Sequence, residues 1–191
     1  MARDRAAAIP LIAEVFREHG YEGASLSLIA AATGLGKGSL YNFFPGGKEE
    51  MAAAVLAGIE AWFETRLYRP LREAPPAEAI ATMLRETDAY FRSGGRVCLV
   101  GMLALDATRD RLAAPIRRYF LDWVEALAGA LRRLGHADAG ARAEQAVLAI
   151  QGALVLSRAL GDEAVFRRAL ERVGAELAMP ANPGPARTPA A

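Results

Sequence analysis

The sequence feature that most constrains the fold is a pair of short helical segments joined by glycines within residues 25–48. Apolar residues recur at helical spacing in its first half, and Ser25 or Ser27 can cap that helix by accepting a free backbone N–H. Gly34 ends the helix, because glycine adopts the left-handed conformation at little cost. A second, very short helix is predicted over residues 39–44, before a proline-glycine-glycine turn. This spacing is typical of a DNA-binding helix-turn-helix, and the alternative is an ordinary pair of packed helices.

The second helix of this pair carries the side chains from which we predict DNA contacts. Lysine, serine, tyrosine and asparagine bind phosphate oxygens or base edges. We expect Tyr41 and Lys48 to hold phosphates, and the other polar residues of the helix to face the groove. Two arginines at the start of the chain either reach phosphates or belong to a solvated tail. The predicted DNA-binding set is Arg3, Arg5, Ser25, Lys37, Gly38, Ser39, Tyr41, Asn42, Phe43 and Lys48.

The same stretch resembles the N-terminal domain of the TetR/AcrR family of transcriptional regulators. It departs from the family pattern at Ala24, where threonine is usual, and at Asn42-Phe43, where paired aromatic or histidine residues are common. One extra residue in the turn before Lys48 resembles the LmrA/YxaF-like branch, as do the later segments CLVGMLAL, YFLDWVEAL and AIQGALVLSRALGD. The matching residues are Gly20-Tyr21, Ser25-Leu26, Ile29-Ala30, Gly34-Leu35, Lys37-Gly38-Ser39-Leu40-Tyr41, Phe44 and Lys48-Glu49.

This resemblance implies a homodimeric repressor that leaves a pseudo-palindromic DNA operator when a small hydrophobic effector binds. The charge distribution supports DNA binding less strongly, because the net charge is +1 and the first 48 residues hold five basic and four acidic side chains. A twofold dimer would double each DNA contact. The alternative hypothesis is a helical ligand- or partner-binding module without specific DNA binding.

Composition and patterning predict an all-α fold. Hydrophobic residues make up 53% of the chain but aromatic residues only 7%, so much of the apolar content is alanine, which favours closely packed helices. The apolar run over residues 97–105 has no second strand to pair with, so we predict a short, fully buried helix interrupted by Gly101. We expect about nine helices. The first is regular from about Ala8, or kinked there by Pro10, and ends at Gly20, whereas the stretch over residues 69–76, with three prolines, is predicted to be a connection. A later helix is predicted over Ala139–Leu160. The chain is predicted to form an N-terminal three-helix helix-turn-helix domain (1–48), a helical ligand-binding and dimerisation domain (49–179) and a disordered tail (180–191).

The second domain carries aromatic and methionine residues that could line an apolar ligand pocket. Each of them is also a plausible core residue, which is the simpler interpretation. Asp88 and Gln151 are the polar residues expected nearest the pocket. The predicted lining is Trp62, Met83, Asp88, Tyr90, Cys98, Met102, Phe120, Trp123, Gln151 and Phe166.

The last two predicted helices have more apolar residues than one buried face requires. Two such helices from each subunit would form a four-helix dimer interface, and a dimer would supply two recognition helices to a pseudo-palindromic operator. The alternative is a monomer in which these faces pack within one chain. The predicted interface residues are Ala146, Ile150, Ala153, Leu154, Phe166, Leu170 and Val173.

An enzyme is a third hypothesis, with little support. The chain has two histidines and one cysteine, which offer few candidates for metal clusters or nucleophilic pairs. We therefore predict no catalytic residue, no metal and no cofactor. Cys98 could be a redox sensor, but we favour its interpretation as a small buried hydrophobic residue. The chain lacks a signal-peptide pattern and any apolar run of membrane-spanning length, so the predicted location is the cytoplasm.

Overall fold

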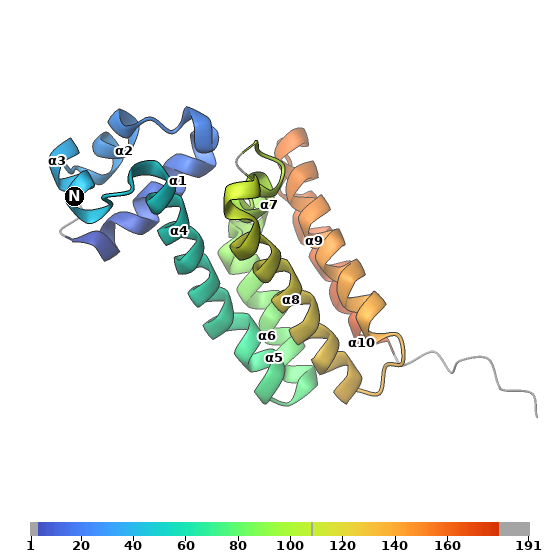
Figure 1. Cartoon of the computed structure of the whole chain (residues 1–191). Coiled ribbons are helices and arrows are strands. Elements are labelled where there is room, and N and C mark those ends of the chain that lie inside the picture. Colours follow the sequence, from blue (N-terminus) through green and yellow to red (C-terminus); the bar gives the residue numbers. More distant parts are fainter. Residues whose placement is uncertain (1–3, 108, 180–191) are drawn as a thin grey trace, which may run out of the picture. The chain divides into compact units, whose positions relative to one another are not determined.

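The computed structural model describes residues 4–107 and 109–179, and within these ranges it contains helices and no strand (Figure 1). The predicted all-α fold class is confirmed. Arg3 and the predicted tail over 180–191 lie outside the described residues. The helices are α1 (Arg5–Gly23), α2 (Leu26–Thr33), α3 (Lys37–Phe43), α4 (Gly47–Phe63), η1 (Glu64–Tyr68), α5 (Arg69–Glu73), α6 (Pro76–Tyr90), η2 (Arg92–Gly94), α7 (Leu99–Ala104), η3 (Arg109–Leu112), α8 (Ala113–Arg133), α9 (Ala139–Leu160) and α10 (Ala164–Ala178).

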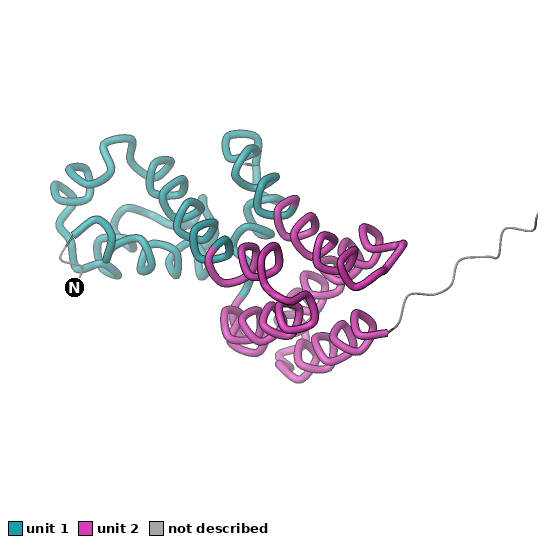
Figure 2. The backbone as a smooth tube through the Cα atoms, turned by 90° about the horizontal axis from the view of Figure 1, so that it is seen from below, with its two compact units in different colours: residues 1–64, 97–120 teal, residues 65–96, 121–191 magenta. Residues whose placement is uncertain are grey.

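The chain divides into two compact units, each built from two separate segments (Figure 2). Unit 1 comprises residues 1–64 and 97–120, and unit 2 comprises residues 65–96 and 121–191. The helix α8 begins in unit 1 and continues into unit 2. Unit 1 therefore contains residues beyond the helix-turn-helix. The domain boundary predicted after residue 48 separates DNA binding from ligand binding and stays a prediction.

Unit 1 is centred on α1, which packs against α2, α4 and α7. Asp4 caps α1 by accepting a hydrogen bond from Ala7 N at 2.8 Å, so the helix begins at Arg5, before the predicted start at about Ala8. Pro10 lies inside the helix, and the non-helical backbone occurs instead at Gly20, whose φ of 69° is in the left-handed region. Glycine adopts this conformation readily, which is why the predicted helix end falls there.

The first part of α8 and the end of α4 complete unit 1. Arg118 of α8 pairs with Glu60 of α4 at 3.0 Å. The rings of Phe63 and Tyr119 meet edge to face with their centroids 4.8 Å apart. The single cysteine, Cys98, is buried beside them, with its sulfur 3.9 Å from the Tyr119 hydroxyl.

Unit 2 is a helical bundle in which α9 and α10 form an antiparallel pair. Arg142, near the start of α9, donates to the backbone oxygen of Glu176, near the end of α10, at 3.1 Å. A close approach beside this pair requires glycine at position 94, because a Cβ there would lie 2.6 Å from the Cβ of Phe166. Gly94 also has a φ of 100°, so both space and backbone conformation exclude a larger residue.

Two local predictions were wrong. The proline-containing connection predicted over residues 69–76 contains the helix α5, because a proline near a helix start loses no internal hydrogen bond. The apolar run over 97–105 is helical but not fully buried: Leu105 is 91% exposed, and Gly101 lies within α7 without interrupting it. The predicted burial is confirmed for Leu99, Val100 and Leu103.

Candidate nucleic-acid interface

The helices α2 and α3 are joined by a turn that begins at a left-handed glycine. The Ser25 hydroxyl oxygen caps α2 by accepting from Leu28 N at 3.2 Å, which gives this predicted DNA-binding residue a local structural partner. Gly34 has a φ of 69°, and its N–H closes the end of α2 on Ala30 O. Thr33 is buried and donates to Ile29 O at 2.7 Å. These contacts position α3 by holding the turn that precedes it.

The helix α3 presents almost its whole surface to solvent. It starts at Lys37, two residues before the predicted start, because the extended backbone of Gly36 serves as its N-cap. Leu40 is its only fully buried side chain, and Phe43 is half-buried. The structure therefore brings five predicted DNA-binding residues together on one exposed helix: Lys37, Gly38, Ser39, Tyr41 and Asn42.

Lys48, predicted to hold a phosphate, lies against the end of α1. Its Nζ donates to Glu22 O at 3.3 Å, lies 3.8 Å from the Glu22 carboxylate and is 4.6 Å from the centre of the Tyr21 ring. About a quarter of the side chain is exposed, so the ammonium group is accessible while it is held. Burial, followed by the charge of Glu49, raises the pKa of Tyr21 above its usual value, so the ring that supports Lys48 stays neutral.

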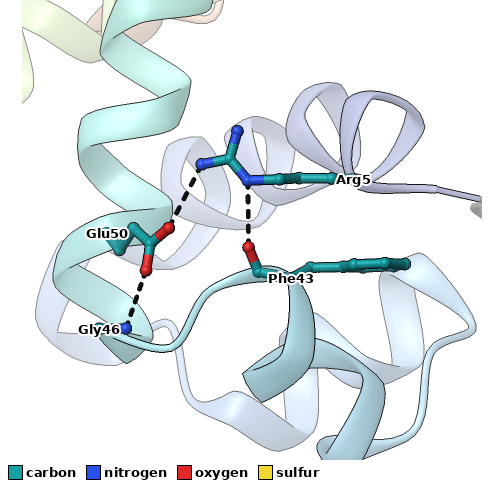
Figure 3. A network of polar contacts seen from close by, with 4 residues as sticks. All are labelled: Arg5, Phe43, Gly46 and Glu50. Carbon is teal, nitrogen blue, oxygen red and sulfur yellow. Dashed lines mark hydrogen bonds and ion pairs between the residues drawn. The ribbon is translucent and has the colours of Figure 1, made fainter.

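Arg5 does not extend freely into solvent. Its Nε donates to Phe43 O at 3.0 Å, and its Nη2 lies 3.4 Å from a carboxylate oxygen of Glu50 (Figure 3). The other oxygen of Glu50 accepts from Gly46 N at 2.8 Å. The guanidinium also lies over the Phe44 ring, 4.9 Å from its centre. We call the contacts among Arg5, Phe43, Gly46 and Glu50 the Arg5–Glu50 network.

The predictions missed Gly46 and Glu50. The signal was present, because a carboxylate in the first turn of a helix often reaches back to a free backbone N–H at the helix start. The partner of that carboxylate was not visible, because Arg5 lies 45 residues earlier in the chain. Arg3 lies outside the described residues.

The predicted pocket residues are distributed over both units. In unit 2, Met83, Trp123 and Phe166 are fully buried, and Trp123 Nε1 donates to Met83 Sδ at 3.4 Å. Asp88 Oδ1 and Gln151 Nε2 are buried without a hydrogen-bond partner among the described residues. Tyr90 is half-buried in the same unit. In unit 1, Cys98 is buried, and the half-buried members are Trp62, Met102 and Phe120.

Most of the predicted dimer-interface residues are buried within the chain. Leu170 is half-buried and the others are buried within the chain: Ala146, Ile150, Ala153, Leu154, Phe166 and Val173. The helices α9 and α10 pack against each other, and these six side chains belong to the interior of the chain. The opposite face of α9 carries apolar side chains that are more than half exposed: Leu148, Val155, Leu156 and Leu160.

Comparison with known proteins adds a second line of observation. Residues 11–55 match the sequence model of bacterial regulatory proteins of the tetR family. Residues 76–172, just over half of the chain, match the C-terminal domain of LmrA/YxaF-like transcriptional regulators. The protein belongs to the LmrA/YxaF-like branch of the TetR family. It is a DNA-binding transcriptional regulator with an N-terminal helix-turn-helix.

Individual relatives support this assignment over most of the chain. The transcriptional regulator LmrA of Bacillus subtilis (strain 168) is 27% identical over 150 residues, which cover 75% of this chain and 80% of LmrA. A TetR regulator from Legionella pneumophila has the same fold, with a TM-score of 0.78 at 22% identity, covering 88% of this chain and 94% of its own. A cysteine mutant of the regulator CifR, solved with 26-base-pair operator DNA, has a TM-score of 0.74 at 27% identity, covering 92% and 97%.

The described residues of this TetR-family regulator hold no group of three or more histidine, cysteine, aspartate or glutamate side chains placed to bind a metal ion. Within the same residues, no helix has the length and apolar character needed to span a bilayer.

Proposed function

We propose that this regulator is a homodimeric repressor that binds a pseudo-palindromic operator through α3 and leaves it when a small, largely hydrophobic effector binds. The observation that carries the DNA-binding part is the surface of α3. Its apolar anchor Leu40 is buried, while its lysine, serine, tyrosine and asparagine side chains are all exposed. A helix of this kind offers groove-facing and phosphate-binding groups without losing its attachment to the domain.

The exposed face of α9 supports the homodimer. Leu148, Leu156 and Leu160 recur at spacings of eight and four residues on one side of the helix, and exposed Gly152 between them permits close approach of a partner helix. Such an apolar stripe is characteristic of an interface covered by another protein surface. A second copy of the same face is the simplest partner, because a twofold axis also pairs two α3 helices for a two-half-site operator.

The effector is proposed to bind within unit 2. Buried polar atoms there that have no hydrogen-bond partner among the described residues include Thr87 Oγ1, Asp88 Oδ1 and Gln151 Nε2. Leaving such atoms unpaired is costly, which favours a ligand that carries hydrogen-bonding groups on an apolar body. Release of the operator further requires that the effector bind one conformation of the dimer more tightly than the other.

This function is one of binding, with no catalytic step. A regulator that binds the operator acts where the DNA is, so we place the protein in the cytoplasm. The alternative, a helical ligand- or partner-binding module, is favoured only by the near-neutral charge of the first 48 residues, and the family assignment argues against it.

The test is a salt series of binding to the DNA immediately upstream of the protein's own gene, with a scrambled duplex as control. We expect tight binding that saturates at a whole number of dimers, with log Kobs falling linearly with log salt. Equal affinity for both duplexes at every salt concentration would contradict the proposal for this operator, and binding to genomic fragments would then separate a distant operator from a module without specific DNA binding.

A further inference from the structure

The Arg5–Glu50 network joins three helices around the turn that follows α3: the start of α1, the end of α3 and the start of α4. Arg5 belongs to the first turn of α1, Phe43 is the last residue of α3, and Glu50 lies in the first turns of α4. The carbonyl of Phe43 is one of the four at a helix end that lack an intrahelical partner, and Arg5 satisfies it. A cation at this position also opposes the partial negative charge of the helix C-terminus.

The start of α4 depends on the same network. Gly46 is its N-cap and has no side chain with which to cap the helix. Glu50 performs this role from within the helix by accepting from Gly46 N at 2.8 Å, and its second oxygen faces Arg5. The carboxylate therefore connects the guanidinium to the turn that separates α3 from α4.

A helix as short as α3 needs such end contacts to keep its orientation. Its seven residues bury one side chain, Leu40, which anchors the helix at a single point but leaves rotation about that point weakly opposed. Arg5 adds a contact at the C-terminal end of the helix through the Phe43 carbonyl, and its guanidinium lies over the adjacent, fully buried Phe44 ring. A contact at the helix end opposes rotation about Leu40, in addition to the turn that holds the start of the helix.

We propose that Arg5 is a positioning residue, which acts through Phe43 O and Glu50 to hold the orientation of α3 in the groove, and that it is not a phosphate contact. The proposal rests on the proposed function, because its readout is operator binding. It replaces the interpretation of Arg5 as part of a phosphate-binding arm. It also gives Glu50, an acidic residue beside a DNA-binding helix, a favourable role in binding a polyanion.

The sign of the Glu50 effect separates the two roles. Removing a negative charge near DNA ordinarily strengthens binding, because it reduces repulsion of phosphates. If Glu50 holds Arg5 in place, Glu50→Gln weakens operator binding despite the lost repulsion. Glu49→Gln is the matched control, since Glu49 is the neighbouring residue, is exposed and removes the same charge from the same helical turn without a contact to Arg5.

The experiment measures operator Kd and its salt dependence for wild type, Arg5→Lys, Glu50→Gln, Glu49→Gln and the Arg5→Lys/Glu50→Gln double variant. We expect Arg5→Lys to raise Kd about tenfold, because lysine keeps the charge but lacks the planar fork that reaches two acceptors. We expect Glu50→Gln to raise Kd about fivefold, in keeping with a half-exposed ion pair. The double variant should lose less than the product of the two, with the salt slope of wild type retained throughout.

The contrary results are equally specific. Wild-type affinity in Arg5→Lys together with unchanged or tighter binding in Glu50→Gln means that Arg5 acts only as a charge, which overturns the proposal. Circular dichroism and thermal unfolding of each variant identify loss of the fold, and the subtler Glu50→Gln carries the test if Arg5→Lys unfolds. Failure of wild type itself to bind any operator would contradict the proposed function instead.

Discussion

Two exposed surfaces of this regulator, on α3 and on α9, differ in nearly every physical respect. The seven-residue α3 buries one side chain and exposes polar ones, whereas the 22-residue α9 buries eight residues on one side and exposes leucines and a valine on the other. Polar side chains on α3 are well solvated when no DNA is bound. Exposed apolar side chains on α9 are unfavourable in water, so the exposed face of α9 favours a permanent protein partner.

The comparison teaches that exposure has opposite meanings on the two helices. On α3 it marks groups that exchange water for a polyanion, so binding depends on salt and on orientation. On α9 it marks the surface that we propose is buried in the dimer, where the hydrophobic effect, which salt screens little, would drive association. Variants on the two helices should therefore separate cleanly into effects on DNA affinity, on assembly and on folding.

The largest effect is expected from a charge on the α9 face. Leu156→Glu places a carboxylate where the proposed dimer interface excludes water, which should weaken dimerisation by about 100-fold or more. Leu105→Glu, at another exposed leucine outside α9, is the control and should leave the dimer intact. Sedimentation equilibrium measures both. A Leu156→Glu protein that stays dimeric at nanomolar concentration would remove α9 from the interface.

Adjacent residues of α3 should separate folding from binding. Leu40→Ala removes the one buried side chain of the helix and should lower the free energy of unfolding of the protein by about 2–4 kcal/mol. Tyr41→Ala, at the next and exposed position, should change it by about 0.5 kcal/mol or less. Urea denaturation at equilibrium compares the two. Equal losses would mean that Tyr41 packs into the domain instead of facing DNA.

A smaller contrast is expected within the exposed residues of α3. Tyr41→Ala should weaken operator and scrambled DNA by a similar factor, because phosphate contacts carry no sequence information. Asn42→Ala should instead reduce discrimination at one base position by about 1–3 kcal/mol while binding to scrambled DNA is kept. Competition binding against a library of single-base operator variants measures both. If Asn42→Ala weakens all sequences equally, Asn42 belongs among the phosphate contacts.

The smallest effect is expected from Tyr21, beneath Lys48. Because burial raises the pKa of Tyr21 in the folded protein, the stability it contributes is fully present below the unfolded pKa of about 10 and is lost as pH rises through the folded value. Above about pH 10 the unfolding free energy of wild type should therefore fall more steeply than that of Tyr21→Phe. Denaturation between neutral and alkaline pH measures this, with Tyr41→Phe as an exposed control. Parallel curves for wild type and Tyr21→Phe would contradict it.

Several elements could be predicted from short-range patterns. The predicted bounds of α9, Ala139–Leu160, are those of the structure, because the left-handed Gly161 ends the helix whatever surrounds it. The same local logic located Gly34 between α2 and α3. It failed for α5, where prolines suggested a connection, because a proline in the first turn of a helix is compatible with both structures.

The exposed face of a helix could be predicted only where one side of the helix was distinctive. On α3 Leu40 is the one fully buried side chain, and the predicted polar residues lie on the exposed surface of the helix. On α9 apolar residues surround the helix, so the sequence could not distinguish the face that packs on α10 from the face that remains exposed. The predicted interface residues, such as Ile150 and Leu154, accordingly proved to be interior.

The amino-acid sequence by itself thus determined the all-α fold, the helix-turn-helix and the identity of α3, because caps, glycine conformations and helical periodicity act within a few residues. The tertiary structure decided which side of α9 is exposed and what Arg5 contacts. Both depend on residues that are far apart in the chain, such as Arg5 and Glu50, whose positions differ by 45. Packing and ion pairs between distant segments arise only when the chain has folded, and no local pattern records them.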